Sequence, residues 1–144
     1  MMQNVLIREM NIDDYPKLAD FSLSEELTLE KVDSIVKRNP GCSFVAEIDG
    51  KPVGIVMCGH DGYRGYLHSM RVDENYRRNN IGKSLTEASI NALKLAGIRK
   101  CNIHVYKDNE AGLAFWQKIG WFKRSDLEHL QILTSSEEDK PVIG

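Results

Sequence analysis

One polar stretch in the middle of the chain combines positive charge with residues that suit a tight backbone turn. Arg77, Arg78 and Lys83 supply the charge, and Asn80 and Gly82 tolerate left-handed backbone that larger residues avoid. Apolar periodicity directly after this turn predicts an amphipathic helix. The first N–H groups of a helix have no acceptor within it, and the helix dipole adds positive potential. The stretch therefore predicts a phosphate or pyrophosphate site, with a capped helix start and solvated arginines as the alternative.

Residues 77–82, Arg-Arg-Asn-Asn-Ile-Gly, follow an apolar strand that ends in Val72. They match neither the P-loop nor the dinucleotide fingerprint. They do resemble [Q/R]-x-x-G-x-[G/A], the signature of the GNAT superfamily of acyl-CoA-dependent N-acyltransferases, with Asn80 in place of the first glycine. Residues 109–121 resemble the family's N-x-x-A-x-x-[F/L]-Y-x-x-x-G-F segment, with Trp116 where tyrosine is common. Two blocks in this order make the resemblance specific, and it covers nearly the whole chain.

The resemblance implies that acetyl-CoA is the co-substrate and that its pantetheine arm lies between splayed fourth and fifth strands. The arm would bond to the main chain near Met70 and Val72, as an added strand does, and the acyl carbonyl would take an N–H near Met70. Asn109 matches a position that commonly meets pantetheine, with a plain helix cap as the alternative, and Trp116 would pack against the coenzyme. The residues expected to bind the coenzyme are Met70, Arg71, Val72, Arg77, Arg78, Asn79, Asn80, Ile81, Gly82, Lys83, Ser84, Asn109, Ala111, Phe115 and Trp116.

A general base is expected on the two splayed strands, because only a neutral amine attacks an acyl group. His104 and Tyr66 match positions where other members of the family carry a glutamate, and His68 is expected on the same face as Tyr66. A hydrogen-bonded structural histidine is the alternative for both histidines. Trp116 replaces the tyrosine that often protonates the departing thiolate, so Tyr106, Tyr66 or water would serve instead. We expect His104→Ala to lower turnover at least about tenfold.

The glycine-punctuated loop over residues 59–65 precedes the fourth strand on the acceptor side. Asp61 could hold an ammonium group and Arg64 a carboxylate, with a hairpin turn and an internal ion pair as the alternative. Because the candidate bases are weak, we expect a small amine or a peptide α-amino group (pKa ~7.7–8.0, against ~10.4 for lysine) as acceptor. The expected activity is direct acetyl transfer to a primary amine in a ternary complex. A catalytically idle acyl-CoA-binding sensor or partner module is the alternative.

Composition limits the class of protein. The 144 residues carry a net charge of −2, which gives no general attraction to nucleic acid or anionic membranes. Cys42, Cys58 and Cys101 lack C-x-x-C spacing, so reduced core thiols are expected rather than a disulfide, a zinc site or a nucleophile. The sequence shows no metal-ligand spacing, signal peptide or membrane-length apolar run. We expect a cytoplasmic monomer or homodimer that needs no metal.

An α/β (α+β) fold must position these residues: a mixed, mostly antiparallel sheet of about six or seven strands with helices on both faces. One domain over residues 1–144 is expected, with a tail that frays from about residue 135. Asp49-Gly50 predicts a type I′ hairpin turn. Helices are expected from Asp13-Asp14, Thr28, Ile81 and Asn109, and strands over residues 5–10, 43–48, 51–59, 66–72, 100–106, 121–125 and 127–134.

Overall fold

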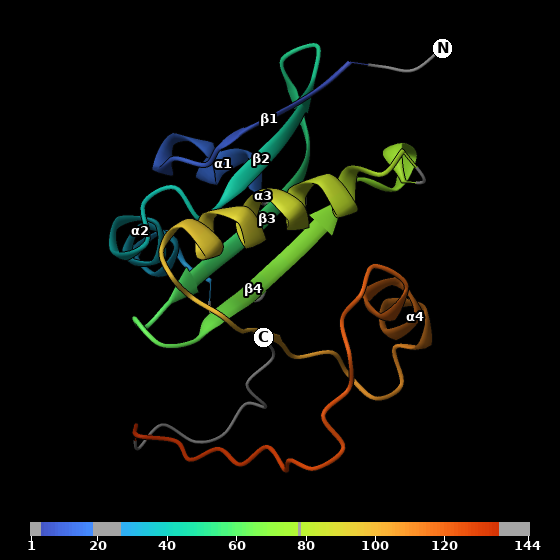
Figure 1. The fold of residues 1–144 in the computed structure, drawn as a ribbon. Helices are drawn as coiled ribbons and strands as arrows, with labels where there is room; N and C mark the ends of the chain where they lie inside the picture. The colour runs from blue at the N-terminus through green and yellow to red at the C-terminus, as the bar shows by residue number, and fades with distance from the viewer. Residues whose placement is uncertain (1–3, 19–26, 78, 136–144) are drawn as a thin grey trace. The chain divides into compact units, whose positions relative to one another are not determined.

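The computed structural model describes residues 4–18, 27–77 and 79–135 (Figure 1). These residues fall into two compact units, the first ending at Ile103 and the second beginning at His104. The expectation of a single domain stays a prediction, and nearly all of the expected frayed tail lies outside the described residues. None of the helices in the described ranges is long and apolar enough to cross a membrane.

The first unit is built on one mixed sheet whose strands lie in chain order. All neighbours are antiparallel except β4 and β5, which are parallel. This confirms the mixed, mostly antiparallel architecture, although the described residues form fewer strands than predicted. At the β2–β3 turn, Asp49 (φ 50°) and Gly50 (φ 76°) both have positive φ, as a type I′ turn requires. The strands are β1 (Val5–Glu9), β2 (Phe44–Ile48), β3 (Lys51–His60), β4 (Gly65–Val72) and β5 (Cys101–Ile103).

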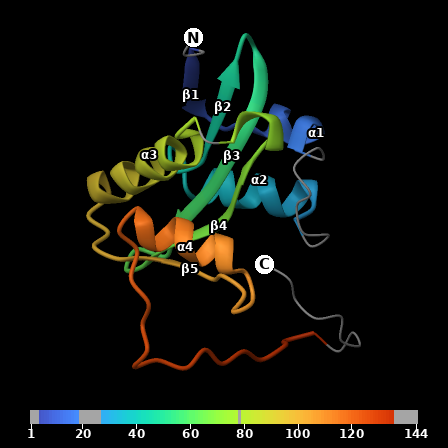
Figure 2. The same ribbon diagram turned by 90° about the vertical axis from the view of Figure 1, so that its right-hand side faces the viewer.

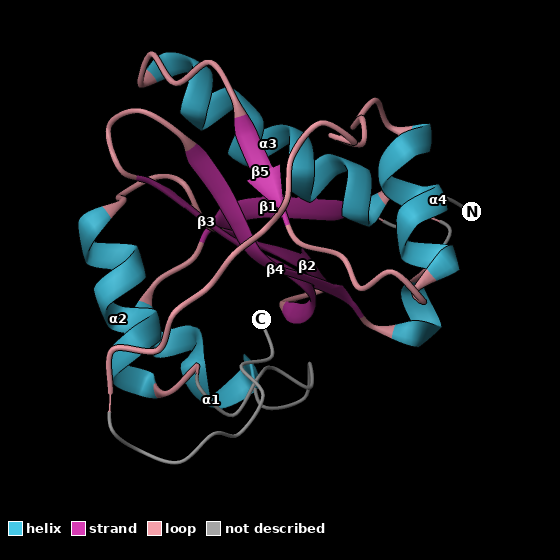
Figure 3. Cartoon of the chain, turned by 90° about the horizontal axis from the view of Figure 1, so that it is seen from below, coloured by secondary structure: helices cyan, strands magenta, loops and turns pink. Residues whose placement is uncertain are grey.

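Helices cover both faces of this sheet, as expected. Figure 2 shows α3 (Ile81–Leu95) on one side and α1 (Tyr15–Leu18) with α2 (Leu29–Arg38) on the other, and Figure 3 gives the same layering from below. On the α3 side the contact is close, because a Cβ added at Gly54 would lie 3.0 Å from Cδ1 of Leu85. On the α2 side a buried cluster joins Met10, Val32, Val45, Ile55 and Met57.

The helix starts show where local prediction succeeds and where it fails. α2 begins directly after Thr28, as predicted, and the Thr28 side chain caps it by accepting a hydrogen bond from the Lys31 N–H at 3.3 Å. A helix also begins after Asp13-Asp14 as predicted, but the cap is Asn11 of the preceding 3-10 turn Ile12–Asp14, with Asp14 completing the capping box. Asp14 is buried and also accepts from Arg8 Nη2 at 2.7 Å. Burial alone would raise the pKa of Asp14, but the hydrogen bonds from Arg8 and the Asn11 N–H outweigh it and lower this pKa.

The second unit contains α4 (Glu110–Lys118) and an extended segment. The side chain of Asn109 accepts from the Gly112 N–H at 2.9 Å, so the predicted helix cap is confirmed. The predicted closing strands over residues 121–125 and 127–134 are wrong, since neither segment is a strand. Leu130 is 89% exposed and Ile132 88%. Alternating apolar residues show only that a segment can be extended; a stable strand also needs a partner edge for its hydrogen bonds.

The fifth strand is also shorter than predicted. It ends at Ile103 rather than at Tyr106, so His104 lies just beyond the strand and begins the second unit. The expectation that His104 lies on the fifth strand is therefore wrong, and the period-two alternation of a strand does not fix its side-chain direction.

Candidate active site

The start of α3 has the backbone expected for an anion site. Asn80 occupies the N-cap position in the left-handed region (φ 59°, ψ 18°), and its side chain makes no capping hydrogen bond. Gly82 is buried inside the first helical turn, so its own backbone is helical rather than left-handed. Lys83 and Arg77 are exposed beside this turn, whereas Arg78 lies outside the described residues. The first N–H groups of α3 therefore lack a side-chain cap and have cations nearby.

β4 changes its pairing half-way along its length. Its ladder with β5 covers only Gly65 to Leu67. Immediately afterwards the register with β3 shifts, because Met57 pairs with Ser69 while Cys58 pairs with Leu67. One residue of β3 thus opposes two of β4, and the extra residue is His68. A bulge of this kind bends a strand and redirects side chains.

The second half of β4 presents main-chain groups at an edge with no strand partner among the described residues. The Asp73 N–H donates to Val53 O on β3 at 2.8 Å. Since these directions alternate along a strand, the N–H and C=O groups of Val72 and Met70 point away from β3. Their carbonyls accept from arginine side chains, Met70 O from Arg71 Nη1 at 3.0 Å and Val72 O from Arg77 Nε at 3.4 Å. The two N–H groups therefore face the open edge.

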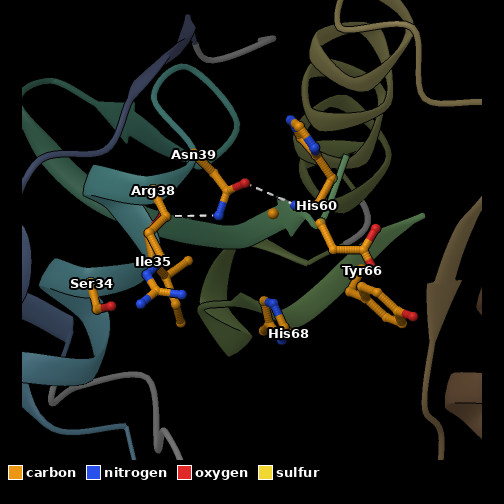
Figure 4. Close-up of a pocket in the computed structure, with 9 residues that line it drawn as sticks. Ser34, Ile35, Arg38, Asn39, His60, Tyr66 and His68 are labelled. Atoms are coloured by element: carbon orange, nitrogen blue, oxygen red, sulfur yellow. Dashed lines mark hydrogen bonds between the residues drawn. The ribbon is translucent and has the colours of Figure 1, made fainter. Parts of the chain in front are cut away.

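A pocket of about 310 Å³ lies on the α2 face of the sheet, where α2 ends beside β3 and β4 (Figure 4). The Asn39 side chain connects α2 to β3 at this pocket. Its Nδ2 donates to Ile35 O at 3.2 Å, and its Oδ1 accepts from the His60 N–H at 2.9 Å. Gly59 allows this contact, since a Cβ there would lie 2.5 Å from Asn39 Nδ2. The lining residues are Ser34, Ile35, Arg38, Asn39, Gly59, His60, Asp61, Tyr66 and His68.

Three residues named from the sequence meet in this pocket. Tyr66 and His68 lie on the same face as expected, with ring centroids 6.3 Å apart and ring planes 25° apart. Asp61 joins them, and its Oδ1 accepts from the N–H groups of Tyr63 and Arg64, both at 2.8 Å. The Arg64 and Tyr63 donors lower the pKa of Asp61. Asp61 therefore stays ionised at neutral pH.

Arg64 lies outside the set of pocket-lining residues. Its guanidinium carbon sits 3.6 Å from the centroid of the Tyr63 ring, and Nη2 donates to the Tyr63 hydroxyl at 2.6 Å. In its place the pocket contains Arg38, together with Ser34 and His60. Sequence reasoning missed these three because no local pattern shows that the end of α2 meets the end of β3.

The other candidates belong to the second unit. His104 keeps much of its surface exposed, and its ring centroid lies 4.5 Å from that of His129. Partial desolvation of the imidazole lowers the pKa of His104 first, and the charge of His129 lowers it further. Tyr106 is 60% exposed. Trp116 is buried and packs edge-to-face against Phe115 and Trp121, with centroid distances of 5.0 and 5.2 Å. Packing is thus the observed role of Trp116 within its own unit.

Cys42 and Cys58 behave as core residues, as expected, whereas Cys101 is only partly buried. All three are free thiols, with Cys42 and Cys58 buried. The hydrogen bond between Cys58 and Cys101, together with burial, raises the pKa of Cys58. A buried thiol with a raised pKa is a poor nucleophile. Within the ranges that the structure covers, no three His, Cys, Asp or Glu side chains gather as a metal site would require.

The sequence model of the acetyltransferase (GNAT) family matches residues 5–121. The chain belongs to the GNAT family. It is an acetyltransferase, and acetyl-CoA is its co-substrate. These findings confirm the predicted family, fold class, enzyme class and coenzyme.

Two curated relatives and one solved structure illustrate the similarity. N-alpha-acetyltransferase 30 of Schizosaccharomyces pombe (strain 972 / ATCC 24843) is 29% identical over 115 residues, which cover 76% of this chain and 77% of that protein. An acetyltransferase of Yersinia pestis (strain Pestoides F) is 33% identical over 86 residues, covering 60% of this chain and 61%, less than two thirds, of that protein. The PaiA N-acetyltransferase of Thermoplasma acidophilum in complex with coenzyme A shares the fold (TM-score 0.73, 22% identity, 87% of this chain and 93% of that chain).

Proposed function

We propose that this GNAT enzyme acetylates a primary amine by direct transfer in a ternary complex, with the amine in the pocket between α2 and β4. The observation that carries this proposal is the position of Tyr66 and His68: both line the pocket, and β4 loses its second strand partner directly after Leu67. The acceptor pocket therefore reaches β4 where its edge begins to open.

The open edge and the start of α3 fit coenzyme A. The outward N–H groups of Met70 and Val72 are donors for an extended amide-bearing chain, in the manner of an added strand. The uncapped first turn of α3, with Arg77 and Lys83 beside it, suits a diphosphate. Bound acetyl-CoA supplies an acetyl group activated as a thioester. The Met70 N–H would stabilise negative charge on the acyl oxygen during transfer.

His68 is the general base that this geometry favours. It lines the pocket and is the bulged residue of β4, two positions before Met70. Its imidazole would accept the proton that the amine nitrogen loses as the new N–C bond forms and the C–S bond breaks. His104 remains the rival base; its lowered pKa keeps it neutral at pH 7. Tyr66 would orient the amine or donate a proton.

Loss of the thiolate does not require a strong acid. A thiol pKa of about 8.5 makes the thiolate a moderately good leaving group near neutral pH. Trp116 cannot protonate it, because an indole N–H is a donor only. Tyr66 and Tyr106 remain the side-chain candidates, and water is the simplest proton source.

The acceptor amine is expected to have a low pKa. An imidazole base, with a reference pKa of about 6.5, deprotonates an α-amino group (reference pKa ~7.7–8.0) far more readily than a lysine side chain (~10.4). The similarity to an N-alpha-acetyltransferase supports the same preference. We therefore propose a peptide α-amino group or a small amine as acceptor.

The experiment is thiol release from acetyl-CoA across a panel of small amines, amino acids and peptides, with calorimetric binding of acetyl-CoA in parallel. Saturable turnover on at least one acceptor supports the proposal. Replacement of the family's common tyrosine by Trp116 favours a second candidate, an idle acyl-CoA-binding module. Tight acetyl-CoA binding without turnover on any acceptor would select that second candidate.

A further inference from the structure

The pocket contains one cation whose charge is not compensated within the described part of the chain. Arg38, the last residue of α2, lines the pocket, and among the residues described it makes no ion pair or hydrogen bond. Its neighbour Lys37 differs, since Lys37 Nζ pairs with Asp33 Oδ2 at 2.9 Å and does not line the pocket. Figure 4 shows Arg38 entering from α2, with Tyr66 and His68 on the β4 side. Within the described residues, no side chain therefore competes with a ligand for this guanidinium.

A carboxylate lines the same pocket from the β3–β4 loop. Asp61 is held by two backbone N–H groups through Oδ1, and it forms no ion pair with Arg38 in the part of the structure described. The pocket thus offers opposite charges, Arg38 from the helix and Asp61 from the loop, that do not neutralise one another. A ligand that satisfies both must itself carry charges of both signs.

We propose that the acceptor is a small amine that also bears a carboxylate, of the size of an amino acid, and that Arg38 binds this carboxylate. The inference rests on the proposed function and names its substrate class. A guanidinium donates two parallel hydrogen bonds to a carboxylate, which fixes orientation as well as affinity. With the carboxylate at α2, the amine points across the pocket toward Tyr66 and His68.

Two further observations favour this class over other amines. The volume of about 310 Å³ is near the lower limit of ligand pockets, so a small molecule fills it. Asp61 attracts the ammonium form of the acceptor before a proton is lost, and it repels ligands with a second carboxylate on that side. A polyamine would place an additional ammonium group against Arg38, an arrangement that costs affinity.

The test compares acceptors that differ only in the carboxylate, and variants that replace one of two neighbouring cations of α2 by glutamine. Binding of an α-amino acid and of its C-terminal amide is measured by calorimetry on the full chain with coenzyme A present, and kinetics are measured where turnover occurs. The variants are Arg38→Gln and the control Lys37→Gln on the same helix. Arg38→Gln is expected to weaken binding of the amino acid about tenfold to a hundredfold and leave the amide and coenzyme A unaffected. Lys37→Gln should change none of them.

Several results would overturn the inference. Tighter binding of the amide than of the amino acid by the wild-type protein contradicts it, and so does an equal effect of Arg38→Gln on both ligands. If Arg64→Gln alone weakened binding of the amino acid, Arg64 rather than Arg38 would bind the carboxylate. Turnover only on amines without a carboxylate refutes the substrate class while the proposed function stands. Selective amino-acid binding without any turnover keeps the pocket assignment and refutes the proposed transfer.

Discussion

The two halves of β4 differ in one respect, the number of strands that pair with them. Gly65 to Leu67 pair with β3 on one side and with β5 on the other. From His68 to Val72 the described structure provides only β3 as a neighbour. The same strand is thus interior in its first half and an edge in its second.

The comparison separates a scaffold from a binding surface. In the paired half, main-chain groups are used within the sheet, and Gly65 packs so tightly under α3 that a Cβ would lie 2.6 Å from Leu93 Cδ1. In the open half, the outward N–H groups of Met70 and Val72 have no strand to donate to among the described residues. Substitution of Gly65 in the first half should therefore change stability, and substitutions in the second half should change coenzyme binding and turnover.

The largest effect is expected where the two halves meet. His68→Ala should lower kcat about 10²–10⁴-fold, because it removes the proposed base. Acetyl-CoA affinity, measured by calorimetry, should be retained. His104→Ala is the comparison, and the pH dependence of both variants is to be recorded. If His104→Ala causes the larger loss and removes the acid limb of the profile, His104 is the base.

Met70→Pro tests the open half directly. Proline removes one N–H, and that N–H faces the open edge rather than β3, so the ladder should survive. We expect kcat to fall about 10²–10³-fold, as on removal of an oxyanion donor. Circular dichroism and thermal unfolding check the fold. Wild-type turnover in a folded variant would show that another group stabilises the acyl oxygen.

The helix start that follows the open half should control affinity. Gly82→Leu combined with Arg77→Glu adds a side chain and reverses a charge where the diphosphate is proposed to bind, so the Kd for coenzyme A should rise at least about tenfold. Lys94→Glu is the matched control, because it reverses a charge at the opposite end of the same helix. Equal affinities for all three proteins would remove the diphosphate site from the start of α3.

Gly65, in the paired half, packs against α3 rather than lining the pocket, so its substitution should change stability alone. Gly65→Ala places a methyl group against the buried Leu93, so urea unfolding should show a loss of about 1–3 kcal/mol. Affinity for coenzyme A should be unchanged in the folded variant. A Gly65→Ala protein that is as stable as the wild type but binds coenzyme A more weakly would contradict this expectation.

The smallest effect concerns the first residue after the β4–β5 ladder. His104 should titrate below 6.5, because burial and the charge of His129 disfavour its imidazolium form. The unfolded chain therefore takes up this proton first, and stability contributed by neutral His104 falls as pH drops from about 6.5 toward the lowered pKa. His129→Gln should raise the pKa of His104 only part of the way, since burial remains. NMR titration of both proteins measures this, and a fall or no change in the variant contradicts it.

Local rules predicted the elements near the site well. The Asp49-Gly50 turn, the Asn109 cap and the helix starts at Thr28 and Ile81 all depend on residues within one or two turns of each other, and all are confirmed. At Asp13-Asp14 the cap is Asn11, and Asp14 also forms a long-range ion pair with Arg8 that no local rule shows. The closing strands failed because strand pairing depends on residues far apart in the chain.

The sequence by itself determined the family and the start of α3, because a left-handed Asn80 followed by a helix is a local backbone choice that residue types impose. Only the tertiary structure decided which side chains share a pocket. Arg38 lines one pocket with Asp61 and His68 because α2 packs across the sheet, and His68 is singled out because the register of β4 shifts against β3. Both facts depend on contacts between segments whose separation in sequence carries no local signal.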